Sequence, residues 1–213
     1  MVDGQLTSEL IHLLYLIAIV AEAMTAALAA GRRQMDWVGV FVLGCVTALG
    51  GGTLRDLLLD HHPLSWVAHP SYLFFTGGGA LLTVIAARYM HHLRGIFLFL
   101  DAIGLVVFTV IGCSVAMTMN LPFVVVIASG VITGCAGGVL RDILCNEVPL
   151  LFRSELYATV SVFCGLLYLI GLYFEYSQSR SAVAAITTGL LFRLFAIHYN
   201  WSMPKFVYNK DLH

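Results

Sequence analysis

Two charged pairs, each preceded by glycines, interrupt apolar segments of this sequence. GGGTLRD runs from Gly50 to Asp56, and GGVLRD runs from Gly137 to Asp142. Charged side chains inside a membrane helix are costly, and those that occur pair with one another or line a water-filled path. Glycine in a helix interior also costs about 1 kcal/mol relative to alanine. The combination indicates either close helix packing or a bent helix beside an ion path.

The glycines fit both interpretations. Small residues recur every four positions in each segment: Gly44, Ala48 and Gly52, then Gly130, Gly134 and Gly138. This spacing allows close packing between helices. A kink or unwound turn would instead free backbone carbonyls, which survive in a membrane only where protein buries them or water reaches them. We favour a bend beside a pathway, with packing alongside it, because charges follow the glycines twice. The expected pore or kink residues are Gly50, Gly51, Gly52, Gly134, Gly137, Gly138, Thr47 and Thr133.

Six charged residues are candidates for the mouths of the pathway or for its gating: Arg55, Asp56, Arg141, Asp142, Glu22 and Asp101. Adjacent helical residues point about 100° apart, so we expect each arginine to pair with an acid from the other half of the chain. Glu22 lies inside an apolar run, where an acid is a functional candidate. Asp101 lines the path, caps a turn or pairs with an arginine. The two threonine hydroxyls either face water or bond to their own helix backbone.

Composition places these residues in an all-α integral membrane protein. Of 213 residues, 60% are apolar and 11% are charged, whereas soluble domains carry about 25% charged residues. Apolar runs near 20 residues recur, which is the length of a membrane-spanning helix. Seven transmembrane helices are predicted near residues 11–30, 37–54, 71–87, 95–117, 121–140, 156–174 and 181–199. The connections are short, so residues 1–213 form a single transmembrane domain.

The chain contains an internal repeat. A shift of 86 residues places Gly44–Leu64 on Gly130–Leu150 with ten identities in 21 positions. Each copy holds three spans: repeat one covers about residues 11–87, repeat two covers about 95–174, and a seventh helix at about 181–199 is added. Because three is odd, the second copy enters the membrane from the opposite side, which gives inverted repeats.

The distribution of basic residues predicts the orientation, and the aromatic residues indicate the span ends. If the N-terminus is outside and the C-terminus is cytoplasmic, seven basic residues lie inside and only Arg180 lies outside, as the positive-inside rule requires. The seven are Arg32, Arg33, Arg88, Arg94, Arg153, Lys205 and Lys210. Aromatic residues near span ends are expected at the membrane interface: Trp37, Trp66, Tyr72, Tyr157 and Trp201.

The sequence shows no pattern typical of an enzyme, a metal site or a nucleic-acid-binding protein. No Ser/His pair or HExxH motif lies within a span, so we expect no catalytic residue and no enzyme. Neither the five cysteines nor the eight histidines show metal-ligand spacing, so no metal or cofactor is expected. The net charge of −1 gives no indication of a nucleic-acid partner.

Several motifs together resemble the prokaryotic branch of the trimeric intracellular cation (TRIC) channel family. They are GGGTLRD and AGGVLRD, the following Pro63 and Pro149, EAMTAALAAGRRQMD after the first span, and LDAIGLVVF at the fourth. The likeness covers about residues 11–206. In the second copy Ala136 replaces the first glycine, so the two bends need not be equally sharp.

This resemblance implies a homotrimer in a bacterial or archaeal inner membrane, surrounded by lipid, with a pore in each subunit. The pore would conduct monovalent cations, potassium and also sodium, and the glycine-rich second and fifth spans would line it. The lysine-bearing lipid motif of animal relatives is not found, so lipid regulation is not transferred. The alternative is a secondary transporter for a small solute such as glycine, since inverted repeats with broken helices are typical of transporters. The lack of a span with a large polar substrate pocket favours the channel.

Overall fold

Helices make up nearly all of the described chain in the computed structural model, which covers residues 2–87, 89, 93–153 and 156–201. Arg88, Lys205 and Lys210 of the predicted orientation lie outside these residues. In chain order the helices are α1 (Val2–Arg32), α2 (Trp37–Leu58), α3 (Ser65–Ala68), α4 (Ser71–Ala87), α5 (Leu93–Thr118), α6 (Phe123–Leu144), α7 (Leu150–Arg153), α8 (Tyr157–Tyr173) and α9 (Gln178–His198).

Five helices are long and apolar enough to cross a membrane. They are α2, α5, α6, α9 and the Glu9–Arg32 part of α1. Helices α4 and α8 are apolar but have 17 residues each, or about 26 Å at 1.5 Å per residue. All seven coincide with predicted spans to within a few residues. The largest difference is at the ends of α2 and α6, which continue to Leu58 and Leu144 and therefore include the Arg-Asp pairs.

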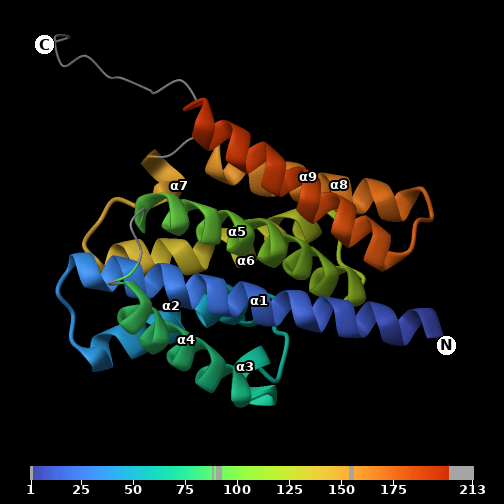
Figure 1. Ribbon diagram of the computed structural model, residues 1–213. Helices are drawn as coiled ribbons and strands as arrows, with labels where there is room; N and C mark the ends of the chain where they lie inside the picture. Colours follow the sequence, from blue (N-terminus) through green and yellow to red (C-terminus); the bar gives the residue numbers. More distant parts are fainter. Residues whose placement is uncertain (1, 88, 90–92, 154–155, 202–213) are drawn as a thin grey trace, which may run out of the picture.

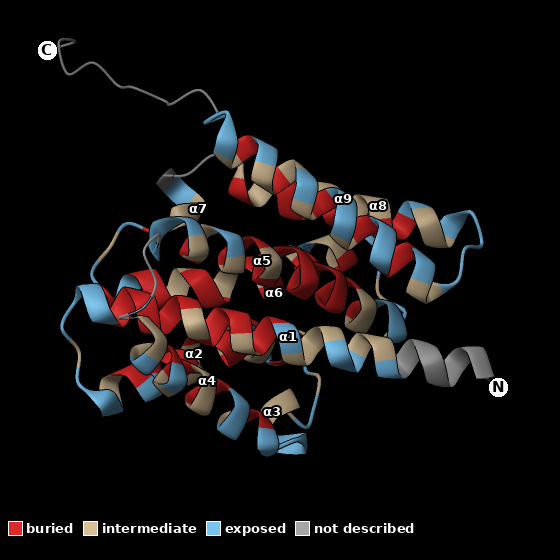
Figure 2. Ribbon diagram, in the orientation of Figure 1, coloured by how far each residue is buried: buried red, intermediate tan, exposed pale blue. Residues whose placement is uncertain are grey.

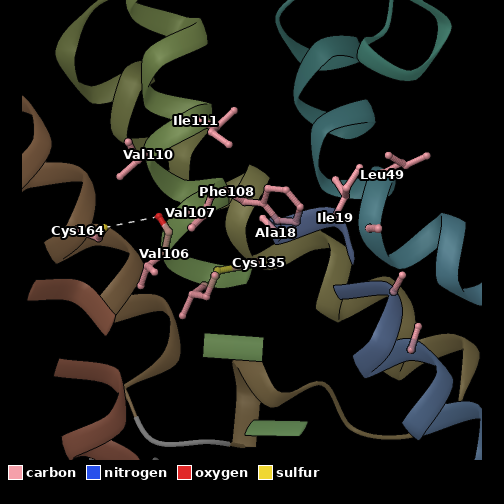
Figure 3. Packing of buried hydrophobic residues seen from close by; sticks show 14 of the residues in the cluster. Ala18, Ile19, Leu49, Val106, Val107, Phe108, Val110, Ile111, Cys135 and Cys164 are labelled. Atoms are coloured by element: carbon pink, nitrogen blue, oxygen red, sulfur yellow. Dashed lines mark hydrogen bonds between the residues drawn. The ribbon is translucent and has the colours of Figure 1, made fainter. Parts of the chain in front are cut away.

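Helices α1, α5 and α6 form the middle of the bundle. Helices α2, α3 and α4 lie on one side of them, and α8 and α9 lie on the other (Figure 1). Burial is concentrated on α1, α5 and the facing part of α6 (Figure 2). Figure 3 shows this core, where Val106, Val107 and Phe108 of α5 meet Ile19 of α1 and Cys135 of α6.

The repeat is visible in the backbone as well as in the residues. Helices α2 and α6 both have 22 residues and begin 86 positions apart, and α4 and α8 both have 17 residues with the same offset. Left-handed residues that end the helices recur at that offset too, at Gln34 and Asn120 and at Asp60 and Asn146. The two halves therefore share helix lengths and turn geometry.

The predicted aromatic belt is partly wrong. Trp37 and Trp201 are 58% and 49% exposed, as interface residues should be, but Tyr72 and Tyr157 are 5% and 3% exposed. Position along a span predicted a place near the membrane surface. It did not reveal that these two rings face the bundle interior.

Candidate functional site

Helices α2 and α6 meet backbone to backbone at their glycines. A Cβ atom on Gly51 would overlap the carbonyl oxygen of Thr133, and one on Gly137 would overlap the carbonyl oxygen of Thr47. These two contacts are equivalent under the 86-residue shift. Such reciprocity is what a local two-fold axis produces. The glycines therefore permit a close approach that any larger side chain would block.

Both helices are continuous through their glycines, and none of the described glycines has a positive φ. An unwound turn, one of the two forms expected from sequence, is therefore absent from α2 and α6 as described. Gly134 packs closely as well, because its Cβ would lie 2.7 Å from the carbonyl oxygen of Leu105 on α5. A bend beside a pathway stays a prediction.

The two duplicated threonines behave differently. Thr133 Oγ1 donates to the carbonyl oxygen of Ser129 at 2.6 Å, so its hydroxyl bonds to its own helix. Thr47 is fully buried, and its hydroxyl has no hydrogen-bond partner among the described residues. The predicted hydrogen bond from the threonine hydroxyl to its own helix backbone is therefore present at Thr133, and among the described residues it is not found at Thr47.

Arg55 and Asp56 form a buried ion pair near the end of α2. Arg55 Nε and Nη2 donate to Asp56 Oδ1 at 2.9 and 2.7 Å, and the residues are 3% and 0% exposed. Asp56 Oδ2 accepts from the backbone N–H and the hydroxyl of Ser65, at 3.2 and 3.0 Å. His61 Nδ1 lies 3.1 Å from Asp56 Oδ1. Asp56 therefore ties the connection after α2 to the helix end.

Arg141, at the end of α6, has more partners than Arg55. Its Nε donates to Asp142 Oδ1 at 2.9 Å, and its Nη1 donates to Asp101 Oδ1 and Thr25 Oγ1, both at 2.9 Å. Glu22 Oε2 lies 3.7 Å from the same Nη1. A buried guanidinium is stable only when its donors are used and its charge is balanced. Here one arginine faces three carboxyl groups from three helices.

Asp142 repeats the structural role of Asp56. Its Oδ2 accepts from the backbone N–H of Leu150, the first residue of α7, at 2.8 Å. Ser65, which bonds to Asp56, is likewise the first residue of α3. In both copies the aspartate holds the short helix that follows.

The surrounding charges differ between the two copies. The positions equivalent to Asp101 and Glu22 under the 86-residue shift are Tyr15 and Phe108. The α2 end therefore has one buried carboxylate beside its arginine, and the α6 end has three. An excess of carboxylates in a protein interior attracts cations or protons.

The prediction that adjacent Arg and Asp do not pair is wrong in both copies. The reasoning considered only the directions of the Cα–Cβ bonds. The arginine side chain is long enough to fold back so that its Nε reaches the next carboxylate. An acid from the other half was predicted correctly for Arg141, where Glu22 is the partner, but not for Arg55. The predicted alternative that Asp101 pairs with an arginine is confirmed.

Two cavities, each about 740 Å³, border the two charged helix ends. The cavity at the α2 end is lined by Ile11, His12, Tyr15, Arg55, His61, His62, Pro63, Ser65, Ala68, His69, Tyr72, Ile111, Val115 and Gln178. The cavity at the α6 end is lined by Ala29, Arg32, Arg33, Arg94, Gly95, Phe97, Leu98, Asp142, Cys145, Glu147, Leu150, Ile197 and Asn200. Tyr15 and Arg32 border different cavities and are about 26 Å apart along α1. The cavities thus lie at opposite ends of the bundle.

The two cavities differ in the charged and titratable residues that line them. The α6-end cavity carries three arginines, and Arg33 forms an ion pair with Glu147 at its edge. Burial raises the pKa of the Cys145 thiol, which lines the same cavity just after α6. The α2-end cavity instead carries four histidines. No ligand chemistry was predicted for these histidines from sequence.

Two residues of this region were missed by sequence reasoning. Arg193 of α9 is fully buried, and its Cζ lies 4.8 Å from the ring centroid of Tyr157. From the sequence, Arg193 was given no role and Tyr157 was placed at the membrane interface. A signal was available for Arg193, because an arginine within an apolar helix calls for a buried partner. Tyr157 offered no comparable signal.

Comparison with known protein families supports the duplication. The family profile described as "Glycine transporter" matches residues 12–88 and 98–173. The two matched segments begin 86 residues apart, which is the offset found in the sequence and in the helices. The profile leaves residues 1–11, 89–97 and 174–213 unmatched, and α9 lies in the last of these ranges.

The chain also matches bacterial membrane proteins along most of its length. A UPF0126 membrane protein of Vibrio cholerae is 38% identical over 209 residues, which cover 98% of this chain and 87% of the relative. The UPF0126 inner membrane protein YadS of Escherichia coli is 35% identical over 204 residues, which cover 95% and 99%.

Solved structures extend the comparison to the fold. A TRIC trimeric intracellular cation channel orthologue from Rhodobacter sphaeroides has a TM-score of 0.86 and 33% identity, covering 90% of this chain and 98% of that one. A prokaryotic TRIC channel in 0.5 M KCl has a TM-score of 0.85 and 29% identity, covering 92% and 100%. Fold and site thus define a helical membrane protein with the TRIC fold. The chain belongs to the prokaryotic TRIC channel family, as its motifs predicted.

Proposed function

We propose that this protein is a monovalent cation-selective channel that conducts potassium and also sodium. The observation that carries the proposal is the pair of cavities at opposite ends of the bundle, each beside a buried Arg-Asp pair. Helices α2 and α6 approach most closely between them. A permeating ion would enter one cavity, pass the glycine contact and leave through the other.

The pathway residues follow from this arrangement. The glycine segments of α2 and α6 form its constriction, together with Thr47 and Thr133. Arg55 and Asp56 border one mouth, and Arg141 with Asp142, Asp101 and Glu22 border the other. The three carboxyl groups buried around Arg141 favour cations over anions at that point of the pathway. Conduction requires α2 and α6 to bend or separate at the glycines.

The assembly and topology are part of the proposal. The chain forms a homotrimer with a pore in each subunit, as its structural neighbours are trimeric channels. Seven helices cross a bacterial or archaeal inner membrane as two inverted three-helix repeats and a seventh helix, with the N-terminus outside. The reciprocal contacts of α2 and α6 support the inversion. The inner-membrane relative supports the location.

Recording from purified protein in planar bilayers tests the channel. We expect unitary currents in KCl, with a reversal potential that follows the cation gradient. Absence of unitary currents from intact trimers would contradict the proposal. Orientation is tested separately by labelling single cysteines introduced at His62 and Asn200 with a membrane-impermeant maleimide, which should reach only the first in intact cells.

A secondary transporter for a small solute such as glycine is the alternative, favoured by the description of the matched family profile. A transporter would show saturable uptake coupled to a proton or sodium gradient, without unitary currents. Proteoliposomes loaded with potassium and supplied with labelled glycine distinguish the two functions. Because the structural neighbours are channels, enzyme activity is not proposed.

A further inference from the structure

Three buried polar atoms border a small recess over Gly138. A Cβ atom on Gly138 would lie 3.3 Å from Tyr157 Oη, 3.5 Å from Arg141 Nη2 and 3.8 Å from Asp101 Oδ1. Among the residues that the structure describes, Tyr157 Oη, Arg141 Nη2 and Asp101 Oδ2 have no hydrogen-bond partner. A buried polar group that lacks a hydrogen-bond partner destabilises the folded state. Two of these atoms border the recess, and the third belongs to the carboxylate whose other oxygen borders it, so the three indicate a shared guest.

The chemistry of the three atoms specifies the guest. Arg141 Nη2 can only donate, Asp101 Oδ2 can only accept when ionised, and the Tyr157 hydroxyl can do both. A water molecule accepts from the first, donates to the second and bonds to the third. The guanidinium repels a bare cation, and the carboxylate repels an anion. Buried waters typically make about three hydrogen bonds to groups that would otherwise be unsatisfied.

Arg193 holds the tyrosine that borders this recess. It comes from α9, outside the duplicated segments, and its guanidinium lies 4.8 Å from the centroid of the Tyr157 ring. Both side chains are buried. A cation over an aromatic face is attracted to the ring, more strongly when both are shielded from water. This contact fixes the ring and with it the hydroxyl.

The other half of the molecule has no equivalent recess. Within 4 Å of a Cβ atom on Gly52, the described neighbours offer only Arg55 Nη2, at 3.7 Å. The position that corresponds to Tyr157 is Ser71, and the one that corresponds to Asp101 is Tyr15. The recess and its clamp are therefore additions to one copy.

We propose that Tyr157, clamped by Arg193, is a positioning residue that retains one water between Asp101 and Arg141. This water sets the orientation of the carboxylate that a cation meets at the α6 end of the pathway. The seventh helix thereby acts on a site built by the two repeats. The role in permeation rests on the proposed channel function, whereas the water site stands independently of it.

Bilayer recording of Tyr157→Phe tests the role in permeation. The variant keeps the ring for Arg193 and removes only the hydroxyl. We expect unitary conductance to change at least twofold and the potassium-to-sodium permeability ratio to shift. Arg193→Lys should change both quantities in the same direction by a smaller factor, since an ammonium keeps the charge without the planar stacking.

Tyr168→Phe is the matched control. Tyr168 is also buried on α8 and lies about 16 Å from Tyr157 along the helix, so this variant should conduct as the wild type does. Wild-type conductance and permeability ratio in Tyr157→Phe would overturn the positioning role. If Tyr157→Phe does not assemble, Gly138→Ala fills the recess instead and should shift the permeability ratio. An unchanged ratio in that variant equally overturns the role.

A high-resolution crystal structure of the wild type tests the water itself and needs no current. It should show an ordered water within about 3.2 Å of Tyr157 Oη, Arg141 Nη2 and Asp101 Oδ2. A map that resolves other buried waters but none here would overturn the proposal. If the wild type gives no currents while the water is present, the channel function fails and the water site stands.

Discussion

Replacing Gly51 or Gly137 by alanine tests the backbone contact between α2 and α6. In each case the new methyl group would overlap a carbonyl oxygen of the facing helix. Backbone cannot rotate away as a side chain can, so the two helices must separate. Gly78→Ala is the matched control, because Gly78 also lies inside a helix but has nothing within 4 Å of its Cβ position.

The expected change in folding stability is the sum of two opposing contributions. Alanine stabilises a helix interior by about 1 kcal/mol relative to glycine, and this gain applies to all three variants. Overpacking costs about 1–3 kcal/mol, and this cost applies only at Gly51 and Gly137. The helix contribution cancels in the comparison, so the two contact variants should be about 1–3 kcal/mol less stable than Gly78→Ala. For a chain of this size, 1 kcal/mol corresponds to about 2–4 °C in Tm.

Thermal unfolding in detergent at one fixed scan rate measures these differences, with assembly followed by size-exclusion chromatography. The double variant should lose less stability than the sum of the single losses, because one separation of the helices relieves both overlaps. If Gly51→Ala and Gly137→Ala are as stable as Gly78→Ala, the close contact does not exist in solution. Strict additivity in the double variant would refute the shared two-fold contact.

Three further outcomes are expected. In the bilayer assay, conductance or open probability should change more in Asp56→Asn and Asp142→Asn than in Asp60→Asn, because the Asp60 side chain is 97% exposed. Equal effects in intact trimers would place the pathway elsewhere. Asp36→Ala should lower stability by about 0.5–2 kcal/mol in thermal unfolding without changing conductance, since Asp36 caps α2 through the Gly39 N–H at 2.7 Å. The rate of maleimide labelling of Cys145 is measured in a chain whose other cysteines are replaced by serine. Because burial raises the pKa of the Cys145 thiol and only the thiolate reacts, the rate should be slow at pH 7 and rise about tenfold per pH unit. A rate independent of pH would contradict this.

Hydropathy and the repeat predicted the helices closely, because a membrane span needs a minimum apolar length whatever its neighbours are. The same reasoning ended two spans at residues 54 and 140, just before the arginines. The helices continue to Leu58 and Leu144 because neighbouring elements bury and pair the charges. A hydropathy profile does not contain information on tertiary contacts of this kind.

The sequence indicated which charged residues lie close together better than it indicated which of them pair. Glu22 and Asp101 were found because acids within apolar runs are conspicuous, and both lie beside Arg141. The pairing of each arginine with its neighbouring aspartate depends on side-chain conformation, which residue spacing does not specify. Tyr157 was missed for a similar reason, since its importance comes from the face it presents and from Arg193.

The unequal charges of the two halves have an electrical consequence. A pore with perfect two-fold symmetry, bathed by the same solution on both sides, passes equal currents at voltages of equal size and opposite sign. Here the backbone repeats, but Tyr15 and Phe108 stand in one half where Asp101 and Glu22 stand in the other. The α6 end therefore holds two buried carboxyl groups that have no counterpart at the α2 end. The proposed channel should therefore pass inward and outward currents of different size, which single-channel recordings at matched positive and negative voltages measure.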